Sequence, residues 1–142
     1  MTSNDAGADS GGANDIPPSS ATELSAWIQA GSWRMWKCEA APHAPRGNSP
    51  HGMNRICQNS IVTAAASGSG DFPVGASFVK EVYDAMGNPT AVFVDTRRSA
   101  ATGAAGWQFF MRGGDGMTME NAPFCATCHQ GAPRDLSFTI VP

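Results

Sequence analysis

The sequence predicts a mainly β, α+β fold: an antiparallel sheet with an N-terminal helix and a second short helix near the C-terminus. Val, Ile, Phe, Thr and Tyr, the residues typical of strands, gather in separate stretches bounded by turn residues. These stretches are Asn54–Ala64, Ala76–Asp84, Thr90–Arg97, Trp107–Arg112 and Leu136–Val141. Sixteen Gly and ten Pro among 142 residues interrupt any long helix. The short turns between successive strands favour a meander.

The first 19 residues differ in composition from the rest of the chain. They are rich in Gly, Asp, Asn and Pro, which predicts a disordered leader. A chain of 142 residues is near the commonest size for one domain, so we expect a single domain over residues 20–142. Such leaders often follow a signal peptide or lipid anchor. We therefore expect an export signal to have been removed from this chain.

The N-terminal helix is predicted from its own start signal. Ser20 and Glu23 form a capping box, and Leu24, Trp27 and Ile28 then share one helical face before Gly31. The following segment, Cys38 to Gly52, is too rich in Pro and Gly for regular structure, so we expect a long loop there.

The charge balance excludes two classes of partner. The net charge is −3 and the pI is about 5.4, so no basic field is present to attract nucleic acid or an anionic membrane. No stretch approaches the roughly 18 apolar residues that a spanning helix needs. We expect neither a nucleic-acid partner nor a membrane span.

The motif that carries chemistry is Cys125-Ala126-Thr127-Cys128-His129. This CxxCH pattern is the attachment site of haem c, because one helical turn presents two thiols to the haem vinyl groups and a histidine to the iron. Asn121 as N-cap and Pro123 in the first turn would begin that helix. A structural disulfide or half of a zinc site are the alternatives, and no second CxxC or HxxxH completes a zinc site.

The position of CxxCH selects among haem proteins. Thirteen residues follow His129 and none is Met, so a sixth iron ligand would have to come from upstream. A small electron-transfer cytochrome, with CxxCH near its start, is therefore disfavoured. The Gly and Pro content and the strand patterns contradict a four-helix cytochrome c′. A β-rich haem protein remains.

Several segments together resemble the cytochrome P-460 and cytochrome c′-beta family. They are His51-Gly52 to Arg55, Phe72-Pro73-Val74-Gly75 with Phe78-Val79-Lys80-Glu81, Trp107-Gln108-Phe109-Phe110, and CxxCH with Asp135-Leu136-Ser137-Phe138-Thr139. The similarity spans about residues 50–141. It implies a periplasmic β-sheet haem protein, commonly a homodimer, with His129 as the proximal iron ligand and an open distal side.

The resemblance also implies two functions. In cytochromes P-460 a Lys at the position of Lys80 is bonded to the porphyrin, Arg55 corresponds to a distal Arg, and hydroxylamine is oxidised to nitrous oxide or other nitrogen oxides. This reaction would need a redox partner protein. In c′-beta members the same fold binds nitric oxide or carbon monoxide without that bond. A third hypothesis is an electron carrier with two axial ligands.

The residues themselves leave several roles open. Lys80 shares a strand face with Phe78 and Val82, but the other face carries Val79 and Tyr83, so alternation does not decide which side is buried. Phe78 is expected to contact the haem. The aromatic lining of the ligand pocket is expected from residues such as Phe72, Phe78 and Phe93. Arg55 is either a distal hydrogen-bond donor or a plain surface residue.

Two further sets of residues have alternative roles. Cys38 and Cys57 are predicted to form a disulfide because haem c is attached in an oxidising compartment, the alternative being two buried thiols. Other side chains could supply a sixth iron ligand, although loop and packing roles are commoner for such residues. They are His43, His51, Met111, Met117 and Met119.

Overall fold

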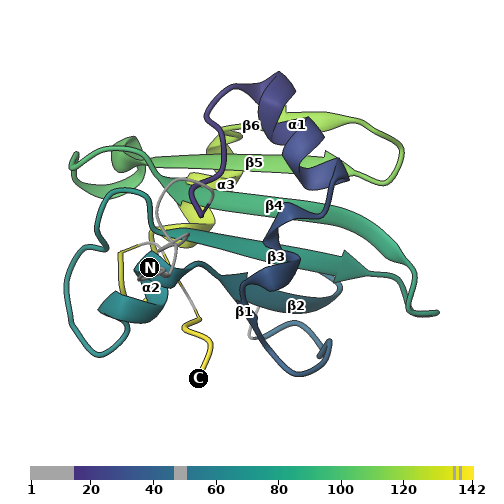
Figure 1. Ribbon diagram of the computed structural model, residues 1–142, viewed down its shortest axis with the longest axis horizontal. Helices are drawn as coiled ribbons and strands as arrows, with labels where there is room; N and C mark the ends of the chain where they lie inside the picture. Colours follow the sequence, from purple (N-terminus) through teal and green to yellow (C-terminus); the bar gives the residue numbers. More distant parts are fainter. Residues whose placement is uncertain (1–14, 47–50, 136, 138) are drawn as a thin grey trace, which may run out of the picture.

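The structure, a computed structural model, describes residues 15–46, 51–135, 137 and 139–142. Its centre is one six-stranded antiparallel sheet whose strands follow chain order, which confirms the predicted α+β class and meander (Figure 1). The strands are β1 (Lys37–Cys38), β2 (Met53–Gln58), β3 (Ser77–Tyr83), β4 (Pro89–Arg97), β5 (Trp107–Gly113) and β6 (Thr118–Glu120).

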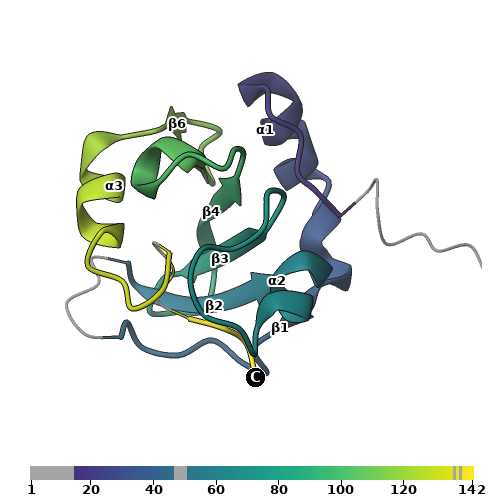
Figure 2. The same cartoon turned by 90° about the vertical axis from the view of Figure 1, so that its left-hand side faces the viewer.

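Helices cover both faces of the sheet. They are α1 (Ala21–Gln29), α2 (Ser60–Ala65), α3 (Pro123–His129) and the 3-10 turns η1 (Ser32–Met35) and η2 (Gly103–Gly106). Figure 2 shows α1 and α3 on opposite sides of the sheet. The start of α1 is as predicted, because the Ser20 hydroxyl accepts a hydrogen bond from the Glu23 backbone N–H at 3.2 Å.

Two predicted boundaries are wrong. The predicted strand Asn54–Ala64 ends at Gln58, because the Asn59 side chain accepts from the Val62 backbone N–H and begins α2. The N-cap of α3 is Ala122, whereas Asn121 was expected. The Asn121 side chain accepts from the Phe109 backbone N–H instead, which ties the entry of α3 to β5. Pro123 does lie in the first turn of α3.

The ends of the sheet also differ from the prediction. Within Leu136–Val141, residues 136 and 138 lie outside the described residues, Ser137 forms an isolated bridge with Arg134, and 139–141 are not in a strand. Val141 is instead buried as a packing residue of the core. The short strands β1 and β6 were not predicted, because two or three residues are too few to show alternation.

Residues 15–19 pack onto the domain, while residues 1–14 of the predicted leader lie outside the described residues. Pro17 is fully buried, and the Arg98 guanidinium donates to the Pro17 and Pro18 carbonyls, both at 2.7 Å. The Asp15 carboxylate accepts from the Ser60 backbone N–H at 2.8 Å. These contacts place residues 15–19 with the folded domain instead of the leader.

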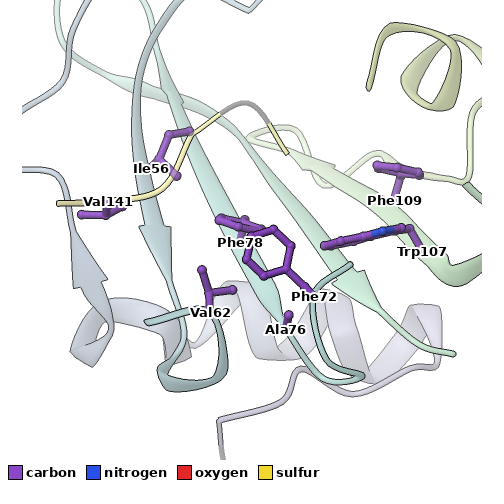
Figure 3. Close-up of a cluster of buried hydrophobic side chains, with 8 residues drawn as sticks. All are labelled: Ile56, Val62, Phe72, Ala76, Phe78, Trp107, Phe109 and Val141. Carbon is purple, nitrogen blue, oxygen red and sulfur yellow. The ribbon is translucent and has the colours of Figure 1, made fainter. Parts of the chain in front are cut away.

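Each face of the sheet has its own apolar core. One cluster lies beneath α2 and α3 and is shown in Figure 3: Ile56, Val62, Phe72, Ala76, Phe78, Trp107, Phe109 and Val141. The other lies beneath α1: Leu24, Ile28, Trp33, Cys57, Val79, Val94 and Phe110. None of the described helices has the length and apolar character needed to cross a membrane.

The predicted disulfide between Cys38 and Cys57 is confirmed. The two residues are directly paired across β1 and β2, with Cα atoms 4.0 Å apart. The disulfide ties β1, which follows the N-terminal helices, to β2.

Candidate functional site

A pocket lies between α3 and the sheet, and the CxxCH residues form part of its wall. Cys125 is half-buried, Cys128 is exposed, and neither is in a disulfide. Burial raises the pKa of the Cys125 thiol. The lining side chains are His51, Lys80, Phe93, Asp95, Phe109, Phe110, Met111, Met119, Ala122, Phe124, Cys125, Cys128 and His129.

The floor of the pocket is set by the register of the strands. Directly paired residues of antiparallel strands point to the same face. One row runs across the sheet through Lys80, Phe93, Met111 and Met119, and a neighbouring row through Phe78, Asp95 and Phe109. The floor is therefore mostly aromatic and thioether, with one cation and one carboxylate in it.

His129 reaches this floor from the last turn of α3. Its ring centroid lies 5.2 Å from that of Phe109, and its Nε2 lies 3.9 Å from Asp95 Oδ2. The second distance is longer than a hydrogen bond, and the contact is an ion pair only when the imidazole is protonated.

Lys80 lies on the face of the sheet that lines the pocket. The alternation of residues along the strand had not decided between the two faces. Burial lowers the pKa of the Lys80 ammonium, against the opposing attraction of Asp95. Phe78 does not line this pocket, but it lines an adjoining one together with Lys80, Asp95 and His129. The structure thus gathers Lys80 and Phe78 near the CxxCH histidine.

Sequence reasoning missed Asp95. Desolvation by burial raises the pKa of its carboxyl group, opposed by the positive charges of His129 and Lys80. Its signal was present in the sequence, because Val92-Phe93-Val94-Asp95 places an acid within an apolar strand on the same face as Phe93.

Arg55 is not brought to this pocket. It pairs with Glu81 across β2 and β3, one position from the Ile56 and Lys80 pair, so it faces the α1 side. Its guanidinium donates to both carboxylate oxygens of Glu81 at 3.0 Å. This hydrogen bonding raises the pKa of Arg55. In the described structure Arg55 is a partner of Glu81.

The other possible iron ligands separate into two groups. Met111, Met119 and His51 line the pocket. His43 bonds Glu39 at 2.8 Å outside it, and Met117 is exposed. Phe93 also lines the pocket, whereas Phe72 packs in the core against Phe78, with ring centroids 5.6 Å apart.

The pocket residues fit a haem. Cys125, Cys128 and His129 all belong to α3 and line a pocket with a floor of Phe and Met, and the donor set of two thiols and one imidazole suits covalent attachment with iron ligation. Within the described residues, no group of three or more His, Cys, Asp and Glu side chains is placed to hold a metal ion.

An antiparallel sheet that faces a CxxCH helix across a pocket with a mostly apolar floor is the arrangement expected of a β-rich haem protein. The chain belongs to the cytochrome P460 family, whose family model matches residues 31–139. This confirms the resemblance seen in the sequence and implies a haem cofactor. A search of curated proteins found no match.

Proposed function

We propose that this protein is an exported c-type cytochrome that binds and oxidises hydroxylamine. The carrying observation is that Lys80 lines the same pocket as Cys125, Cys128 and His129. In cytochromes P-460, unlike the c′-beta members of the family, a Lys is bonded to the haem ring, and the resemblance matches that Lys to Lys80. The Cys38–Cys57 disulfide supports an oxidising compartment such as the periplasm.

Each pocket residue has a defined task in this proposal. The thiols of Cys125 and Cys128 add across the two vinyl groups, which needs no oxidant because nothing leaves. His129 ligates the iron on one side. The apolar floor excludes water from the site. A bound haem supplies the redox centre at which a nitrogenous ligand loses electrons.

Lys80 is suited to nucleophilic chemistry because burial lowers the pKa of its amine. Bonding of that amine to a ring carbon releases two protons and two electrons, which an oxidant must accept. Turnover then converts two molecules of hydroxylamine to one nitrous oxide, one water, four protons and four electrons. A redox partner protein would accept those electrons. The homodimer that the resemblance implies stays a prediction.

The test uses the exported, matured protein. Mass spectrometry under denaturing conditions is expected to find one haem on the polypeptide, and tryptic mapping to find the Lys80 peptide joined to the Cys125–His129 peptide. Lys80→Ala is expected to abolish hydroxylamine oxidation while thioether-bound haem remains. Lys37→Ala is the matched control, because Lys37 is exposed on β1, away from the pocket lining. A protein that matures without covalent haem would refute the proposal.

A second function is favoured by the apolar character of the pocket. Phe93, Phe109 and Met111 offer an uncharged surface that suits nitric oxide or carbon monoxide. An unmodified Lys80 peptide, together with a high-spin spectrum, would support this c′-beta-like function. A low-spin spectrum would instead indicate two axial ligands and electron transfer, with Met111 or Met119 near enough to the pocket to be considered.

A further inference from the structure

His51 lies in a loop and lines the pocket. It stands two residues before β2 and lines the pocket together with His129. Its ring meets Phe93 edge-on with centroids 4.5 Å apart. The side chain is only partly exposed, so it belongs to the wall of the site.

The two histidines stand over neighbouring rows of the floor. His51 contacts Phe93, and His129 lies 5.2 Å from Phe109, which pairs with Asp95. Phe93 and Asp95 are two residues apart on one strand, so the rows are roughly 7 Å apart. The two imidazoles therefore stand over different rows of the pocket floor, separated along the strands.

The pocket favours the neutral form of the His51 imidazole. Burial, with the positive charges of Lys80 and His129, lowers the pKa of His51 to about 4. The ring is therefore neutral at pH 7, with one N–H donor and one acceptor nitrogen. The Asp95 carboxylate also lines the pocket.

We propose that His51 contacts the ligand on the side of the haem opposite His129, through a hydrogen bond to the small molecule at the open iron position. The inference rests on the proposed function for the haem and its His129 ligand. It specifies the ligand class as a small molecule with a hydrogen-bonding nitrogen or oxygen, such as hydroxylamine.

The test compares His51→Leu, His51→Gln and the control His43→Gln in the matured holoprotein. His43 is a loop histidine outside the pocket, bonded to Glu39. In His51→Leu, hydroxylamine binding to the ferric protein is expected to weaken about tenfold, the effect of one lost hydrogen bond. The C–O stretching frequency of the ferrous carbon monoxide complex is expected to rise, because a donor to the bound oxygen is lost. His51→Gln keeps a donor and should show smaller changes.

Each outcome bears on the proposal. Unchanged affinity and stretching frequency in His51→Leu would overturn it, and so would a wild-type low-spin spectrum that becomes high-spin in His51→Leu, since that shows direct ligation. The infrared readout needs no turnover. Bound haem that does not oxidise hydroxylamine therefore counts against the proposed function alone, whereas a protein without haem overturns both.

Discussion

The two faces of the sheet each carry a carboxylate, buried Glu81 on one and half-buried Asp95 on the other, and surround it in opposite ways. On the α1 face, Glu81 accepts from the Trp33 indole at 2.7 Å, from Arg55 at 3.0 Å and from the Tyr83 hydroxyl. These donors hold the pKa of Glu81 below its usual value although burial opposes them. On the pocket face, burial of Asp95 raises its pKa, and its approach to His129 is 3.9 Å.

From this difference we infer that the carboxylate on the α1 face contributes to stability and the carboxylate on the pocket face contributes to function. A buried carboxylate with a full set of donors stabilises its surroundings, and removing it leaves those donors without a partner. A carboxylate whose burial is not fully offset by hydrogen bonds or ion pairs lowers the stability of the fold, and such groups gather at functional sites. We therefore expect substitutions on the α1 face to change the free energy of unfolding, and those on the pocket face to change ligand chemistry.

The largest expected effect is on the α1 face. Leu24 is fully buried there, so Leu24→Ala should lower the free energy of unfolding by about 3 kcal/mol or more through the cavity it leaves. Denaturant unfolding of the holoprotein measures this. The matched variant Met119→Ala removes a half-buried pocket residue and should cost less. Equal losses in the two variants would break the comparison.

Glu81→Gln should have a smaller effect of the same sign. Gln keeps an acceptor oxygen but loses the charge, so we expect a loss of about 1–2 kcal/mol at pH 7. Because the folded pKa of Glu81 is lowered, its stabilisation is present above the unfolded value of 4.5 and is lost as the pH falls through the folded pKa.

The pH series adds an independent check on Glu81. Thermal unfolding between neutral and acid pH should show a shallower acid loss in Glu81→Gln than in the wild type. Parallel curves for the two proteins would contradict the stabilising role of Glu81.

The smallest expected change in stability is in Asp95→Asn, within about 0.5 kcal/mol of the wild type, because the amide is cheaper to bury than the carboxylate. Its visible effect should be on the absorption spectrum and on ligand affinity of the holoprotein, since Asp95 lies beside His129 and Lys80. A loss of stability as large as that of Glu81→Gln would place Asp95 in the same class as Glu81.

Local features of the molecule could be predicted from the sequence because their physics is local. The capping residue Ser20, the strands β3 and β4, and the meander follow from side chains within a few positions of one another. The CxxCH set is of the same kind, since helical spacing alone brings its three side chains to one face of a helix. The prediction of the disulfide needed one further premise, that the protein matures in an oxidising compartment.

Segments with two competing local signals could not be predicted in this way. The apolar run after Gln58 reads as a continuing strand, yet the Asn59 cap turns it into α2. The Pro-rich segment before His51 shows no periodicity, so nothing in it indicates that His51 enters a pocket.

The faces of Lys80 and Arg55 were decided by the tertiary structure. Both sides of β3 carry apolar residues because helices cover both faces of the sheet, and alternation then gives no sign of which side holds the site. The register across β2, β3, β4 and β5 assigns Lys80 to the face of α3 and Arg55 to the face of α1. Residues far apart in the chain meet at a site only through such pairing, which depends on the whole sheet and not on any single segment.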